Sequence, residues 1–223
     1  MKSIIQQLLR VSLLFAWILS SPLHGQGIKI SSGAYLKTYG TPYIIVKDGN
    51  LSNSGTWSSS GTGLTTFSGT SPVLFSGYGT TVMYDVLLSN TGGILQQIRQ
   101  VDMHNLNITS SSMMTIDTAK AVIVSNVIDN QRGTDGLYLR SRADGINATL
   151  VFHNSYSSPV SATVEMYSKA YKGTSYKWQY FGIPLRSVVA SPTFDGTYVR
   201  KHNEPGWNAG YTNANLWISQ TNS

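Results

Sequence analysis

Histidine, cysteine and acidic side chains are the usual metal ligands and acid–base groups of enzymes, and this sequence has few of them. It contains no cysteine, so neither a disulfide nor a thiolate metal site can form. Beyond the N-terminal segment the histidines are His104, His153 and His202, and no pair of them has metal-ligand spacing. We therefore expect no metal, no cofactor and no catalytic histidine.

The carboxylates are equally sparse, with ten Asp and Glu residues in 223. Glycoside hydrolysis needs two opposed carboxylates at a defined separation. The candidate pairs are Asp85 with Asp102, and Asp129 with Asp135, but nothing in their spacing ties either pair together. Arginines that would suit a polysaccharide lyase are present without an acidic cluster for calcium. The sequence therefore predicts no catalytic residues. A polysaccharide lyase or hydrolase is the least favoured function for this chain.

Aromatic residues near the C-terminus are the candidates for ligand binding. An aromatic ring offers a flat apolar face on which a sugar ring can stack. Trp178, Tyr180, Trp207 and Tyr211 are the predicted ligand-binding residues. The alternative for Trp178 is a core position, because side chains of a strand alternate between its two faces. Trp207 follows a Pro-Gly pair and is expected in an exposed loop.

Residues 1–25 have the three parts of a secretory signal peptide. Lys2 and Arg10 form a positive region, residues 11–19 (VSLLFAWIL) form an apolar run, and small residues lead to a cleavage site between Gly25 and Gln26. The apolar run is too short to span a bilayer, which needs about 20 residues. We therefore expect an exported chain with no membrane span after cleavage.

The composition favours an extracellular β protein that binds no nucleic acid. Only 12% of the residues are charged, and the formal charge of +6 falls to +4 when Lys2 and Arg10 leave with the signal peptide. The remaining basic residues are scattered, whereas nucleic-acid-binding proteins gather them in a patch or stripe. The expected partners are glycans or other surface proteins.

Short runs of β-branched and aromatic residues, separated by Gly, Ser, Asn and Thr, follow the signal peptide. No apolar stripe recurs at helical spacing. The pattern predicts an all-β protein with strands at residues 43–46 (YIIV), 64–67 (LTTF), 73–75 (VLF), 81–88 (TVMYDVLL) and 121–124 (AVIV).

A repeat with a period near 20 residues runs through the middle of the chain. With an offset of 20, residues 83–88 (MYDVLL) align with 103–108 (MHNLNI), and a further shift of 21 aligns 124–127 (VSNV) with 103–106 (MHNL). Upstream, 51–55 (LSNSG) aligns with 88–92 (LSNTG) at an offset of 37, which we interpret as two shorter turns.

Short strands at such a period are typical of a solenoid whose turns stack and bury one another's apolar side chains. We therefore predict a right-handed parallel β-helix, or solenoid, followed by an antiparallel β segment. The alternative is a β-sandwich, in which short strands recur every 8–12 residues or so.

The pattern changes near residue 145. Residues 147–152 (NATLVF) and 162–167 (ATVEMY) are longer strands that alternate more regularly, and we interpret them as antiparallel hairpins. They would form a small β domain or cover the last turn, because an exposed strand edge favours aggregation. The predicted organisation is a signal peptide (1–25), solenoid-like repeats (26–144) and an antiparallel cap or small domain (145–223).

The run NLSNSGTWSSSGTGLTTFSGTSPVLFSGYGTTVMYDVLLSN (residues 50–90) resembles repeats in large secreted and cell-surface, adhesin-like proteins of Gram-negative bacteria that use type IX secretion. In those proteins a later segment often has the form Trp…Phe…Gly-Ile-Pro with a Tyr and a Glu downstream. Residues 178–184 (WQYFGIP), Tyr198 and Glu204 match that form, so the resemblance covers residues 50–217. It implies a parallel β-helix and a place outside the cell, but no chemistry.

Members of that family usually end in a shared sorting domain, which residues 216–223 (LWISQTNS) do not resemble. We therefore expect a fragment of a longer protein, export by another route, or a final location in the periplasm. The favoured function is a non-enzymatic secreted or cell-surface structural, adhesin-like module. The alternative is a carbohydrate-binding module of a larger exported protein.

Overall fold

The computed structural model describes residues 27–142, 145–154 and 159–167, together with four short strands nearer the C-terminus. The predicted signal peptide, residues 1–25, lies outside the described residues. The chain divides into one unit that ends at Ser168 and a second that spans Lys169–Ser223. All regular structure in the described residues is β-strand except one 3₁₀ turn at Gly133–Asp135.

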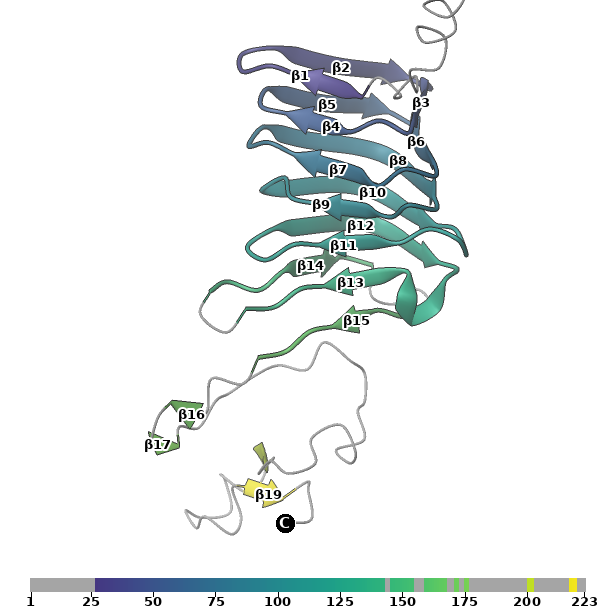
Figure 1. Cartoon of the computed structure of the whole chain (residues 1–223). Helices are drawn as coiled ribbons and strands as arrows, with labels where there is room; N and C mark the ends of the chain where they lie inside the picture. The colour runs from purple at the N-terminus through teal and green to yellow at the C-terminus, as the bar shows by residue number, and fades with distance from the viewer. Residues whose placement is uncertain are drawn as a thin grey trace, which may run out of the picture. The chain divides into compact units, whose positions relative to one another are not determined.

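The first unit is a parallel β-solenoid of about six turns, as the sequence predicts (Figure 1). Each turn of the coil begins with a short strand of one seven-stranded sheet. Every neighbouring pair in this sheet is parallel. In spatial order the strands are β1 (Ile28–Ile30), β4 (Leu51–Asn53), β7 (Val73–Ser76), β9 (Ile94–Gln96), β11 (Met114–Ile116), β13 (Leu137–Leu139) and β15 (Thr163–Val164).

The rest of each turn crosses an eight-stranded parallel sheet. In the first two turns this crossing is made by two strands, and in the next three by one long strand that bends. The main path is β2 (Tyr35–Gly40), β5 (Thr56–Gly61), β8 (Thr80–Asn90), β10 (Gln100–Ile108), β12 (Ala121–Asn130) and β14 (Thr149–Phe152). The side path is β3 (Tyr43–Lys47) and β6 (Leu64–Gly69), which pairs with the second half of β8.

Strand pairing confirms the 20-residue repeat. Met103 pairs with Met83, Leu106 with Val86, and Ile108 with Leu88, all between β10 and β8. This stacked register excludes the β-sandwich alternative, whose sheets are antiparallel.

The alignment one turn further is correct at its start and wrong at its end. Val124 pairs with Met103 as predicted, but Leu106 pairs with Ile128 and not with Val127. A β-bulge between these pairs adds one residue to β12. Because side chains alternate across a strand, the extra residue turns Val127 outward, where it is 37% exposed, and places Ile128 in the core.

The 37-residue alignment is wrong as a turn-to-turn match. Residues 51–53 lie in β4 of the first sheet, whereas 88–90 end β8 in the second sheet. The two segments are alike because each ends a strand with a fully buried asparagine, Asn53 or Asn90, before a turn.

The parallel coil extends past residue 144. Strand β14 pairs in parallel with β12, and β15 pairs in parallel with β13, so the interpretation of residues 147–152 and 162–167 as antiparallel hairpins is wrong. A solenoid strand has one face toward the core and one toward solvent, so its side chains alternate as regularly as those of an antiparallel strand.

Antiparallel pairing begins in the second unit. Strand β16 (Tyr171–Lys172) pairs with β17 (Ser175–Tyr176), and β18 (Arg200–His202) pairs with β19 (Trp217–Ser219). The solenoid is therefore followed by antiparallel strands, as predicted.

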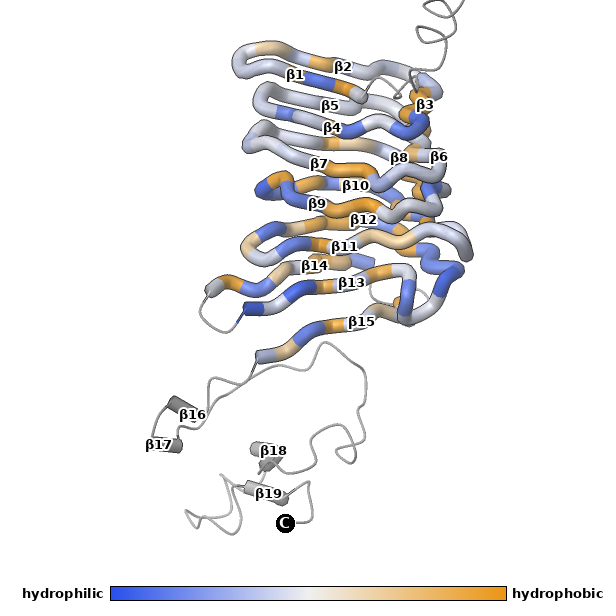
Figure 2. The backbone as a smooth tube through the Cα atoms, in the orientation of Figure 1, coloured by the Kyte–Doolittle hydropathy of each residue, from blue (hydrophilic) through white to orange (hydrophobic). Residues whose placement is uncertain are grey.

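The core lies inside the coil, where each turn contributes apolar side chains at alternate positions. Figure 2 shows hydrophobic stretches on strands β7, β9 and β12 of successive turns. Phe67 and Phe75 meet there from the two sheets with ring centroids 4.5 Å apart. The largest fully buried side chains are Trp57, Phe67, Phe75, Leu51, Leu88, Ile94, Ile98, Leu106, Ile108, Met114, Ile116 and Leu137.

Glycine is required at one corner because two turns approach closely there. Gly40 and Gly61 are paired between β2 and β5, and both have positive φ, 65° and 128°. A Cβ on Gly61 would collide with the backbone of Gly40. Only glycine satisfies both conditions, since other residues disfavour positive φ.

Candidate functional site

The four predicted ligand-binding residues, Trp178, Tyr180, Trp207 and Tyr211, lie outside the described residues. The solenoid itself nevertheless presents exposed aromatic side chains. They gather on the first turn, in strands β2 and β3.

Strand β2 has Tyr35, Lys37 and Tyr39 on its outer face, while Leu36 faces the core. The two tyrosines are 70% and 69% exposed. The Lys37 ammonium lies 5.8 Å from the centre of the Tyr35 ring, a cation–π contact. We call these three residues the aromatic row.

Strand β5, the next strand of the sheet, replaces the aromatic row with hydroxyl groups. Tyr35 pairs with Thr56, Lys37 with Ser58, and Tyr39 with Ser60. Within the described part of the chain, none of these three hydroxyls has a hydrogen-bond partner. The outer face thus places a row of free hydroxyls beside the aromatic row.

Strand β3 continues the exposed apolar surface on the first turn. Tyr43 and Ile45 are 61% and 57% exposed, and Lys47 follows them on the same face. In β6 below, Leu64 and Thr66 occupy the positions of Tyr43 and Ile45. The aromatic side chains of this surface therefore belong to the first turn.

The first turns are also cationic. Residues 27–84 contain Lys29, Lys37, Lys47 and a single acid, Asp48. The Asp48 carboxylate is occupied, because it accepts backbone N–H groups of Thr70 (2.6 Å) and Ser71 (2.8 Å). These two hydrogen bonds, that from Ser71 above all, lower the pKa of Asp48 below its ordinary value.

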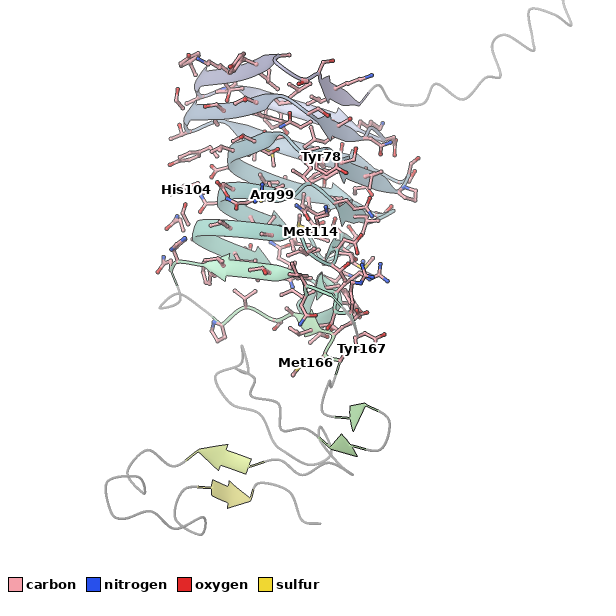
Figure 3. All side chains as sticks on the ribbon, turned by 90° about the vertical axis from the view of Figure 1, so that its left-hand side faces the viewer. Tyr78, Arg99, His104, Met114, Met166 and Tyr167 are labelled. Atoms are coloured by element: carbon pink, nitrogen blue, oxygen red, sulfur yellow. The ribbon has the colours of Figure 1, made fainter. Side chains whose placement is uncertain are left out.

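A second aromatic contact lies on the same sheet two turns further along. Tyr84 and His104 stack with ring centroids 4.3 Å apart, and His104 Nδ1 lies 3.1 Å from Ser125 Oγ. His104 therefore occupies the outward position shared with Tyr84 and Ser125, as the repeat predicts. Figure 3 shows it at the edge of the solenoid, away from the core.

The two acids of the candidate pair Asp85 and Asp102 have different hydrogen-bond partners. Asp85 accepts a hydrogen bond of 2.6 Å from the Asn105 amide, and Asp102 accepts one of 2.8 Å from Gln100. In the register of the sheet Asp85 stands opposite Asn105, whereas Asp102 stands opposite Val82. The two carboxylates therefore belong to different columns of the sheet.

The second pair is also separate. Asp129 lies in β12, one residue before its end, and accepts a hydrogen bond of 3.1 Å from Gln131, while Asp135 lies in the 3₁₀ turn. Within the described ranges no three His, Asp or Glu residues are grouped so as to hold a metal ion. The same ranges contain no helix with the length and hydrophobicity of a membrane span.

A ladder of amides follows the bend of the second sheet. Asn105 donates to Asp85, and its own oxygen accepts from the Asn126 amide (2.9 Å) and from the Val127 N–H (3.1 Å). These bonds join three successive turns at the β-bulge. We assign this ladder a structural role.

One more exposed aromatic residue lies at a corner between the sheets. Tyr78 is 85% exposed, and the Lys120 ammonium lies 6.0 Å from its ring centre.

Sequence reasoning missed the aromatic row. The signal was present as the alternation Tyr-Leu-Lys-Thr-Tyr in residues 35–39, with one apolar core residue between two outer aromatic residues. Because aromatic residues are more numerous in the C-terminal part, the sequence placed the predicted ligand-binding residues there instead.

No family model, curated protein or solved structure matches this chain.

Proposed function

We propose that this protein is a non-enzymatic, secreted or cell-surface structural module of adhesin-like type. The solenoid supplies a rigid body whose outer positions repeat at every turn. The predicted signal peptide and the resemblance of residues 50–90 to type IX-secreted surface proteins support its place outside the cell.

The observation that carries the proposal is the exposure of Tyr35, Tyr39, Tyr43 and Ile45 together on the first turn. Soluble proteins rarely expose adjacent large apolar side chains unless they contact a partner. A contact surface on a solenoid is the arrangement that adhesion needs.

The second candidate is a carbohydrate-binding module of a larger exported protein. The row of free hydroxyls beside the aromatic row favours it, because sugars offer both apolar ring faces and hydroxyl groups. A polysaccharide lyase or hydrolase is less favoured, since the carboxylates Asp85, Asp102 and Asp129 each accept a hydrogen bond from an amide side chain.

Surface display can be tested in cells that make the protein. Antibodies against the solenoid should label intact cells as strongly as permeabilised cells, and protease added to intact cells should remove the signal. A periplasmic protein should stay protected until the cells are permeabilised. Labelling only after permeabilisation would contradict surface display.

A further inference from the structure

We infer that the aromatic row and the adjacent hydroxyl row bind an acidic polysaccharide. This inference rests on the proposed function and names its ligand class. The contact would place sugar rings on Tyr35 and Tyr39, and an anionic group of the polysaccharide against Lys37.

The spacing of the aromatic row suits a linear polymer. Tyr35, Lys37 and Tyr39 are alternate residues of one extended strand, so each lies about 6–7 Å from the next. The row is thus a straight line of ring, cation and ring. A linear chain laid along β2 meets both rings in succession.

The hydroxyl row adds hydrogen bonds beside the rings. Thr56, Ser58 and Ser60 stand one strand away, which is about 4.8 Å in a sheet. Thr38 and Ser59, by contrast, hydrogen-bond to each other at 3.0 Å. The outward hydroxyls therefore remain available to a ligand.

Charge selects an acidic ligand. Residues 27–84 carry three lysines and one acid, and that acid is held by backbone N–H groups. The other acids of the described residues all follow residue 84. A polyanion would thus meet attraction at the first turns without nearby carboxylates to repel it.

Two other polyanionic partners fit less well. Single-stranded nucleic acid also stacks on aromatic side chains, but it is held by a basic groove that tracks the backbone, whereas one lysine lies within the aromatic row. Anionic membranes attract clusters of basic residues, typically four or more. Rows of hydroxyls favour a sugar over both.

The experiment measures binding of the purified mature chain to four probes by calorimetry at low salt. The probes are a polyuronate (alginate), a neutral glucan (dextran), an oligothymidylate, and vesicles of phosphatidylglycerol. The variants are Tyr35→Ala with Tyr39→Ala, and Lys37→Gln. The matched controls are Tyr167→Ala, which removes a tyrosine that is 53% exposed in residues 159–167, and Lys120→Gln.

We expect the chain to bind alginate more tightly than dextran. The double tyrosine variant and Lys37→Gln should each weaken alginate binding about tenfold, with the controls unchanged. Circular dichroism should show all variants folded, because the substituted side chains are exposed.

Three results would overturn the inference: no binding to alginate, equal binding to alginate and dextran, or preference for oligothymidylate or vesicles. Equal losses in the variants and in their controls would place the site elsewhere and would overturn it too. Intact-cell labelling separates these outcomes from the proposed function, since a displayed protein that binds no acidic glycan fails here alone.

Discussion

Buried amide side chains stabilise the corners of the coil by hydrogen bonds. Asn53 donates to the Thr80 carbonyl and to the Thr81 hydroxyl, both at 2.8 Å, and accepts the Gly55 N–H at 3.0 Å. Such bonds satisfy backbone groups that leave the sheet at a turn. At this scale single polar residues join neighbouring turns, as Asp48 also does on the outside.

Asp48→Asn tests the corner carboxylate. Its pKa is lowered in the folded protein, so the stabilisation that it supplies is fully present above the unfolded pKa and is lost as the pH falls through the folded value. We expect the variant to melt below the wild type at neutral pH, and the difference to shrink below about pH 4.

Thermal unfolding followed by circular dichroism between about pH 7 and pH 2 measures this difference. Asp129→Asn is the matched control, since that exposed carboxylate accepts only a side-chain amide. A melting difference that does not change with pH would contradict the role given to Asp48.

At the scale of one strand, alternation decides which side chains stabilise the protein. Leu87 and Leu88 are neighbours on β8, with Leu88 fully buried in the core and Leu87 on the outer face. The same alternation places the aromatic row outside and Leu36 inside.

Leu88→Ala should lower the free energy of unfolding by about 2–5 kcal/mol, because it leaves a cavity in the core. Leu87→Ala, the matched control, should cost roughly 1 kcal/mol or less, because the Leu87 side chain buries less apolar surface than the Leu88 side chain does. Urea unfolding measures both. Similar losses for the two variants would show that the register of β8 is wrong.

The amide ladder makes a separate prediction. Asn105 forms three hydrogen bonds across successive turns, so Asn105→Ala should cost roughly 1–2 kcal/mol. Asn107 lies two residues further on the same strand and makes no side-chain hydrogen bond within the described residues, so Asn107→Ala should be nearly neutral. Equal melting temperatures of the two variants would remove the structural role of the ladder.

At the scale of the whole molecule, the solenoid unit is stabilised by a core that runs through its stacked turns. Among the residues whose burial the structure describes, those of the core lie within 30–139, inside the solenoid. Coil stability is then a sum over neighbouring turns, each of which buries its neighbours' side chains.

A chain that ends at Ser168 tests whether the solenoid folds without the second unit. It should keep the β spectrum of the solenoid and melt within a few degrees of the full chain, because it contains all of the buried core that the structure describes. A chain that ends after β12 should melt lower, since it loses Leu137 and Leu139 from the core. Loss of structure in the chain that ends at Ser168 would show that the second unit is needed for folding.

The sequence by itself determined the all-β class, the near-20-residue repeat and the outward place of His104, because burial and side-chain alternation are written in residue order. Only the tertiary structure decided the rest. One bulge residue exchanges Val127 and Ile128 between solvent and core, and parallel strands with one wet face look like hairpins in residues 147–167. The alternation of residues 35–39 carries the aromatic row in the sequence itself. The hydroxyl row of Thr56, Ser58 and Ser60 beside it comes only from the tertiary structure, since pairing between turns is a relation in space.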